Sequence, residues 1–263
     1  MDPALRAAAS GMMAQQLRTE VISNNLANVN TTGFKRSRAN FEDLLYQTVQ
    51  GAAVIGQPDS QTQPAVQIGR GTRLVGVQRL HTQGALETTN RPLDVAIEGE
   101  GFFQVQTGGG QTAYTRDGSF QISDQGVLVT SQGYTVQPTI RVPSDASAVT
   151  ISRTGIVTVV RGNATAEPQE IGRLELARFA NPAGMQSLGE NLYQPTPASG
   201  EPTAGFPQEE GMGRIVQGCL EGSNVEIVQE MVDMITAMRA YEINSKAIKQ
   251  SDEMGQMANN MTR

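Results

Sequence analysis

The segment from Asn224 to Met257 constrains the fold more than any other part of this chain, because it contains no proline and a single glycine, Gly255. Ser223 stands just before it and Glu226 follows three residues later, which is the pattern of a capping box. A helix over this segment would reach roughly 50 Å, well beyond the average helix of a globular domain. A helix of this length must pack against another part of the chain or another molecule.

Apolar residues mark the face of this helix that would meet that surface. Val225, Val228, Val232 and Ile235 alternate by three and four residues, as in a helix seam. The stripe then moves to neighbouring positions: Met231, Met234, Met238, Tyr241 and Ile248. Methionine adapts to irregular packing, so this broad stripe predicts a helix-contact face and not a cofactor site.

A second helix is predicted over residues 4–28, with Pro3 in its first turn and the Asn28–Gly33 segment ending it. Its seam positions are Leu5, Ala8, Met12, Gln15, Thr19, Ile22, Leu26 and Val29. Polar Gln15 and Thr19 in the middle leave surface that another copy could cover, which points to self-association. We expect Val228, Val232, Ile235 and Met238 to pack against Leu5, Met12, Ile22 and Leu26 of the same or an adjacent copy, with Val225 and Tyr241 extending the surface.

Between these helices the pattern changes to short β-branched runs separated by turns. Turn residues recur every 7 to 10 residues, including Gln125-Gly126, Gln132-Gly133 and Thr154-Gly155. Asp117-Gly118 between two short runs predicts a hairpin. The middle is therefore expected to be an all-β domain.

The whole pattern predicts an α+β chain with a discontinuous, coiled-coil helical base built from both termini. We expect residues 1–46 and 222–263 to form that base and residues 72–193 to form the β domain. Residues 47–71 and 194–221 are rich in Gln, Pro, Gly and Ser, which is typical of extended connectors.

Composition excludes several function classes. The chain has one Cys and one His, Cys219 and His81, so it cannot build a Cys/His metal site or an internal disulfide. Its 20 Lys and Arg against 26 Asp and Glu leave no basic stripe for nucleic acid. Gly99-Glu100-Gly101 precedes a strand, so it is a turn and not a nucleotide loop.

Other candidate groups also predict no chemistry. Asp94, Glu98 and Glu100 surround a turn and are expected to be solvated, and His81 is expected to be structural. We therefore expect no catalytic residue, cofactor or metal. Residues 7–14 imitate a signal peptide only faintly, and no apolar run is long enough to span a bilayer, so neither a cleaved signal nor membrane insertion is expected.

Several separate motifs then resemble those of the flagellar axial proteins, the rod, hook and hook-associated subunits. The N-terminal motif is carried by Asn24, Asn25, Leu26, Ala27, Asn28, Gly33 and Phe34. Further matches in the same order are residues 91–97 with 101–103, 114–120, 223–225, 230–232 and 239–246. Residues 43–47, 67–71 and 81–84 are similar to subunits of the distal part of the rod. Cys219 stands where such subunits are expected to have Tyr.

The resemblance implies a structural subunit that is exported unfolded by the flagellar type III apparatus and stacks helically around a channel, with the β domain outside. It implies contacts with proximal rod subunits, the hook protein and the surrounding P and L rings, in a straight shaft that crosses the periplasm and transmits torque. A proximal rod or hook-type subunit is the alternative. A sugar-binding or enzymatic β domain with helical arms is a remote one.

Overall fold

The computed structural model describes residues 3–50, 53–54, 62–63, 65–162, 167–209 and 211–261. The chain divides into two compact units. The first, here the helical unit, contains Met1–Ala27, Ser37–Gln78 and Glu226–Arg263. The second, here the β unit, contains Asn28–Arg36 and Arg79–Val225. Both units are thus assembled from segments far apart in the sequence, and the α+β class expected from the sequence is confirmed.

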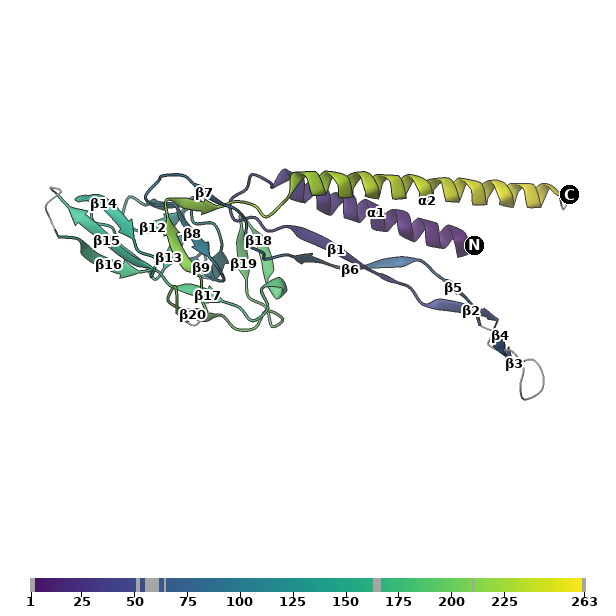
Figure 1. The fold of residues 1–263 in the computed structure, drawn as a ribbon, viewed down its shortest axis with the longest axis horizontal. Coiled ribbons are helices and arrows are strands. Elements are labelled where there is room, and N and C mark those ends of the chain that lie inside the picture. Colours follow the sequence, from purple (N-terminus) through teal and green to yellow (C-terminus); the bar gives the residue numbers. More distant parts are fainter. Residues whose placement is uncertain are drawn as a thin grey trace. The chain divides into compact units, whose positions relative to one another are not determined.

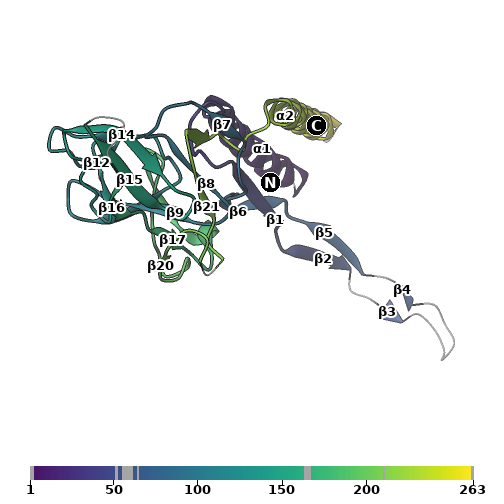
Figure 2. The same ribbon diagram turned by 60° about the vertical axis from the view of Figure 1, so that its left-hand side comes forward.

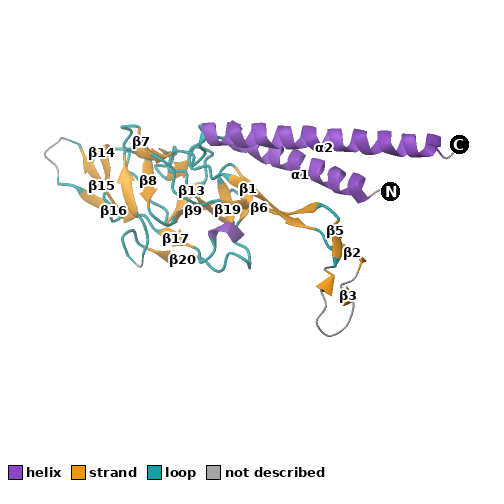
Figure 3. Ribbon diagram, turned by 45° about the vertical axis from the view of Figure 1, so that its right-hand side comes forward, coloured by secondary structure: helices purple, strands orange, loops and turns teal. Residues whose placement is uncertain are grey.

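Two long helices lie side by side in the helical unit (Figure 3). They are α1, Pro3–Ala27, and α2, Ile227–Met261. The predicted helices at both ends of the chain are confirmed, and the described part of α2 continues to Met261. From Ile227 onward the sequence contains no proline and a single glycine, Gly255, so nothing in the sequence breaks the helix.

The helix α2 does not begin at the predicted capping box. The Ser223 hydroxyl accepts a bond from the Val225 N–H at 3.3 Å, which is a local turn and not a helix cap. The Asn224 side chain accepts from the Arg36 N–H at 2.7 Å and donates to the Leu80 carbonyl at 2.8 Å. These bonds hold the chain in an extended form, so the helix starts three residues later than expected.

The predicted connector at 47–71 is instead part of a two-stranded ribbon, as far as its residues are described (Figures 1 and 2). Its strands are β1 Ser37–Asp43, β2 Tyr46–Gln50, β3 Ala53–Val54, β4 Thr62–Gln63, β5 Val66–Gly69 and β6 Thr72–Arg79. They pair as β1 with β6, β2 with β5 and β3 with β4. The ribbon therefore belongs to the helical unit and extends across the expected boundary at residue 72.

The β unit is built around one nine-stranded sheet, in which β11, β12, β13, β9, β10, β19 and β18 are neighbours in that order. β17 pairs with β9 and β20, and β14, β15 and β16 form a separate sheet. The strands are β7 Leu86–Thr88, β8 Val95–Glu98, β9 Phe102–Gln106, β10 Thr112–Thr115, β11 Phe120–Ile122, β12 Leu128–Thr130, β13 Thr135–Gln137, β14 Ala146–Ile151, β15 Ile156–Arg161, β16 Gln169–Arg173, β17 Leu176–Arg178, β18 Gln186–Gly189, β19 Leu192–Gln194, β20 Thr203–Gly205, β21 Arg214–Gln217 and β22 Cys219–Glu221. A 3₁₀ turn covers Pro182–Gly184.

Residues 194–221, which the sequence suggested as a second connector, contribute three paired strands to this unit. β20 pairs with β17, β21 with β8 and β22 with β7. The composition of the segment is typical of a linker because Pro and Gly separate very short strands. Each of these strands, however, pairs with a strand that comes earlier in the chain. The end of the chain's β region is thus tied to its beginning.

The turn predictions have a mixed outcome. Gly126, Gly133 and Gly155 all have a positive φ and close tight turns, as predicted. The predicted Asp117-Gly118 hairpin is wrong, because the preceding strand β10 pairs with β9 and β19 while β11 pairs with β12. Gly118 is required there by close approach: a Cβ would lie 1.7 Å from the Val95 carbonyl oxygen.

Candidate assembly surfaces

Several small and polar side chains lie in the seam between α1 and α2. Ala237 and Glu230 of α2 are fully buried, and Gly11 of α1 lies so close to Asn244 that a Cβ would come within 2.8 Å of its amide nitrogen. The Arg18 guanidinium pairs with the Asp233 carboxylate at 3.2 Å across the same seam. Close approach of the backbones and polar pairs thus contribute to holding the two helices together.

Most of the predicted apolar stripe of α2 is exposed within the chain, whereas Met234 and Ile248 are half-buried. Val228 is 76% exposed, and Val232, Ile235, Met238 and Tyr241 are 43–55% exposed. These residues are thus largely available within one chain, and their packing against Leu5, Met12, Ile22 and Leu26 stays a prediction for neighbouring copies. On α1, Ile22 is buried and Leu5, Met12 and Leu26 are half-buried, while Val225, before α2, is buried in the β unit. Large apolar side chains exposed together usually mark a contact with another molecule.

The second Asn of the N-terminal motif has a clear structural role. Asn25 is 1% exposed, and its side chain accepts from the Ser37 N–H at 2.9 Å and donates to the Ser37 carbonyl at 2.8 Å. It also donates to the buried Glu230 carboxylate at 3.1 Å. One side chain thus joins α1, the first residue of β1 and the first turn of α2, because a buried amide must satisfy its donors and its acceptor.

The ribbon offers a second apolar surface. Leu45 is 86% exposed, and Val49, Val66, Val75 and Val77 are 48–63% exposed. The base of the ribbon is fixed to α1, since the Thr72 N–H donates to the Ser10 hydroxyl at 3.2 Å. The described part of the ribbon is therefore attached to α1 at its base, here its root, and exposes several valine side chains.

A buried ionic group, here the junction cluster, contains Lys35, Arg116 and Glu221 of the β unit. The Glu221 carboxylate accepts from Lys35 Nζ at 2.6 Å, from Arg116 Nε at 2.8 Å and from the Gly84 N–H at 2.9 Å. All three charged side chains are at most 5% exposed. The cluster joins the segment that follows α1, the sheet, and the strand that precedes α2.

Sequence reasoning missed this cluster. Its residues stand 186 and 105 positions from Glu221, so no local spacing brings them together. The signal in the sequence is weak, because Lys35 is followed directly by Arg36 and Arg116 by Asp117, so neither stands out as an isolated charge. Such a charge is either solvated or buried with a partner.

The rest of the N-terminal motif surrounds the cluster or ends α1. Gly33 has φ of 69°, donates its N–H to the Glu221 carbonyl at 2.7 Å, and has room for no Cβ against the Asp117 backbone. Phe34 is buried beneath the Arg79 guanidinium, 5.9 Å from its ring centre. Asn28 accepts from the Thr31 hydroxyl at 3.2 Å in the turn after α1. Asn24 and Ala27 are exposed at the end of the helix.

His81 is packed as an aromatic residue. Its ring meets Phe102 and Tyr193 edge to face, with centroids 5.6 and 5.4 Å away. Burial and, to a smaller extent, the nearby cations Lys35, Arg79 and Arg116 together lower the pKa of His81 to about 4. The imidazole is therefore neutral at pH 7, which suits a structural role.

We expect the protein to lose stability as the pH falls from about 6.5 to 4, because the unfolded histidine binds a proton in this window and the folded one does not. The full effect is about 3 kcal/mol. Urea unfolding of the wild type and of His81→Phe across this pH range measures it, since the variant should lack this part of the slope. His81 is the only histidine in the chain, so its NMR titration reports the folded pKa directly. A midpoint near 6.5 would contradict the prediction.

The three acidic residues considered for catalysis do not converge. Glu98 pairs with Arg214 at 2.7 Å and Glu100 with Arg178 at 2.9 Å, both near the surface. Asp94 is buried and lies 3.9 Å from the Arg91 guanidinium. The sulfur of Cys219 lies 3.8 Å from the Thr88 hydroxyl. Among the residues that the structure describes, no group of His, Cys, Asp and Glu is arranged to hold a metal ion.

Three family models match the chain. The flagella basal body rod protein model matches residues 5–35, the flagellar hook protein FlgE/F/G D1 domain matches residues 96–159, and the flagellar basal body rod FlgEFG protein C-terminal model matches residues 216–261. The flagellar basal-body rod protein FlgG of Borreliella burgdorferi is 51% identical over all of both chains. The chain belongs to the flagellar basal-body rod protein family. It is a FlgG-like structural subunit of the flagellar basal body and not an enzyme.

Two relatives from one bacterium allow a finer comparison. FlgG of Caulobacter vibrioides is 48% identical over 95% of this chain and 96% of its own length. FlgF of the same bacterium is 35% identical over 98% of this chain and 97% of its own length. The chain is thus more similar to FlgG than to FlgF. None of the helices in the described ranges is both long and apolar enough to cross a bilayer.

Proposed function

We propose that this subunit assembles helically with copies of itself into the hollow, straight distal rod of the flagellum, which transmits torque to the hook. The observation that carries the proposal is the apolar stripe on α2, which is exposed in the single chain although it contains valine, isoleucine and methionine. The expected coiled-coil tube would form when these side chains meet the half-buried Leu5, Met12 and Leu26 of neighbouring copies. The higher identity to FlgG supports a distal over a proximal position.

Assembly would also stabilise the helical conformation of the two terminal segments. Their seam within one chain buries few large apolar groups, with Ile22 as the main one, so most of its contacts are small or polar. A helix pair of this kind gains little from burial to offset the entropy lost on ordering. This fits a subunit that is exported unfolded, without a cleaved signal, through the flagellar type III apparatus and that gains its full helical order on joining the rod.

The remaining partners follow from the same placement in the periplasm. Proximal rod subunits would contact one end of the polymer and the hook protein the other, while the P and L rings would surround the β units. Electron microscopy of the purified protein at high concentration tests the central claim. A straight hollow tube with helical symmetry is expected, and discrete globular particles would overturn the proposal.

The ribbon is expected to keep the polymer straight by contacting neighbouring copies through its exposed valines. Tyr46 and Gly69 are direct cross-strand partners, so residues 47–68 can be replaced by an Asn-Gly turn without disturbing the root of the ribbon. We expect this variant to polymerise into curved or flexible filaments, as measured by persistence length in micrographs. An unchanged circular dichroism spectrum and melting temperature of the monomer serve as the control. Filaments that stay straight and equally stiff would contradict this role.

A further inference from the structure

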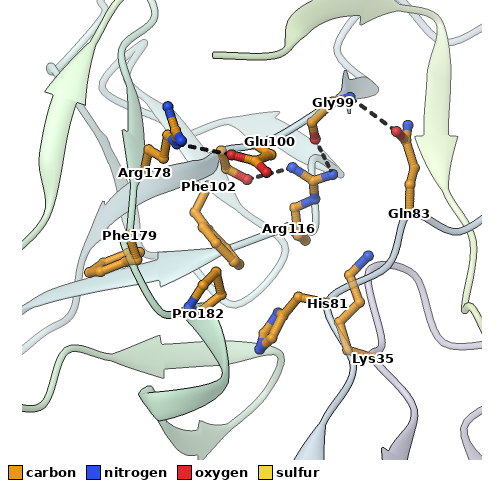
Figure 4. Close-up of a pocket in the computed structure, with 11 residues that line it drawn as sticks. Lys35, His81, Gln83, Gly99, Glu100, Phe102, Arg116, Arg178, Phe179 and Pro182 are labelled. Carbon is orange, nitrogen blue, oxygen red and sulfur yellow. Dashed lines mark hydrogen bonds and ion pairs between the residues drawn. The ribbon is translucent and has the colours of Figure 1, made fainter. Parts of the chain in front are cut away.

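A cavity of about 250 Å³ opens beside the junction cluster, entirely within the β unit. Its lining includes the apolar side chains of Phe102, Phe179 and Pro182 and the charged side chains of Lys35, Arg116, Arg178 and Glu100 (Figure 4). Glu221, the acid of the junction cluster, is not among the residues that line it. The junction cluster therefore contributes its two cations to the cavity wall and not its acid, while the Glu100 carboxylate of the lining is paired with Arg178.

Among the residues that the structure describes, the two buried cations have fewer hydrogen-bond acceptors than N–H groups. Lys35 Nζ donates to the Thr82 carbonyl at 2.7 Å and to Glu221 at 2.6 Å, which uses two of its three protons. Arg116 donates through Nε to Glu221 and through its two terminal nitrogens to the carbonyls of Gly101 and Gly99, which uses three of five. Buried donors of this kind normally find a partner.

The charges of the junction cluster do not balance either. Lys35 and Arg116 share the single carboxylate of Glu221, which leaves one net positive charge buried at the cavity wall. Arg178 is already paired with Glu100, which is 70% exposed. Burial is the main reason that the pKa of His81 in the same wall is lowered, and the nearby cations Lys35, Arg79 and Arg116 add to this effect, which agrees with a positive local potential. A buried net charge is costly unless a counter-charge reaches it.

We propose that this cavity is an anion-binding site that takes one carboxylate or phosphate-sized oxyanion on the free N–H groups of Lys35 and Arg116. The apolar wall of Phe102, Phe179 and Pro182 would exclude water from the far side of the ligand and strengthen these bonds. The oxyanion can come from solution or from an acidic side chain of another copy of this chain.

The test compares the melting temperature of the purified full chain in sodium phosphate, in sodium acetate and in sodium chloride at equal ionic strength. A ligand that binds only the folded state raises the melting temperature with its concentration. We expect a rise of several degrees in phosphate or acetate over chloride, and no such rise in Lys35→Met, whose cluster carries no net charge. Arg141→Gln is the matched control, because it removes one exposed positive charge of the β unit outside the cavity and should respond as the wild type does.

Crystals of the wild type soaked in selenate give a second measurement that needs no variant, and an anomalous peak between Lys35 and Arg116 is expected. If free anions neither stabilise the monomer nor appear in the cavity, the anion is expected to be an acidic side chain of another copy. The critical concentration for polymerisation then tests this source, and this measurement alone rests on the proposed function. An increase of about tenfold in Lys35→Met but not in Arg141→Gln, with both monomers fully folded under the assay conditions, assigns the site to an acidic side chain of a neighbouring copy. If none of these measurements shows an effect, the proposal is overturned.

Discussion

Replacing Glu221 with alanine is expected to destabilise the β unit by about 3–5 kcal/mol, since it leaves two buried cations without their shared acid. The change also removes the acceptor of the Gly84 N–H, but it keeps the backbone carbonyl that Gly33 needs. Burial already lowers the pKa of Lys35, and loss of the carboxylate lowers it further. Lys35 would then release its proton more readily as the pH rises, so the loss of stability should be smaller at high pH. Urea unfolding at two pH values measures both effects.

Lys35→Met is the matched control for this prediction, because it removes a charge from the same cluster with the opposite consequence. Arg116 and Glu221 remain as a balanced pair at 2.8 Å, and the Thr82 carbonyl still accepts from Asn224 at 3.1 Å. We expect a loss of about 1 kcal/mol or less. If the two variants lost similar amounts of stability, the imbalance of charge in the junction cluster would not be what governs it.

The long helices could be predicted from the sequence, but the face that each uses within the chain could not. Absence of Pro and Gly over residues 227–254 and regular apolar spacing are local signals. Which face meets α1 depends on how closely the backbones approach, and here Gly11, Ala237 and Glu230 decide it. The valines and methionines made the stronger pattern, and within the chain most of them, including Val228, Val232 and Met238, are exposed.

Long-range pairing explains the other differences. β20, β21 and β22 look like linker sequence because each is only three or four residues long, and their partners β17, β8 and β7 come earlier in the chain. The Asp117-Gly118 dipeptide has the composition of a hairpin, yet the glycine is needed for contact with β8. Local composition cannot separate these uses, because the same residues serve a turn, a short strand or a close approach.

The exposed stripe on α2 leads to the second large effect, which concerns assembly and not folding. Ile235 is 49% exposed and points away from the seam with α1, so Ile235→Asp should change the stability of the isolated chain by less than about 0.5 kcal/mol. In the polymer the same aspartate would be buried without a partner in every copy. That costs about 3–5 kcal/mol per subunit. The critical concentration for polymerisation should therefore rise by roughly a hundredfold or more.

Sedimentation of the polymer over a range of protein concentrations measures this critical concentration, and motility of cells that carry the variant gives an independent readout. Thr236→Asp is the matched control: it places the same side chain one residue further along α2, on an exposed position outside the apolar stripe. We expect that variant to polymerise nearly as the wild type does, because an aspartate that stays in water costs little. Normal assembly of Ile235→Asp, or equal loss in both variants, would show that the valine and methionine stripe is not the surface through which copies of this chain meet.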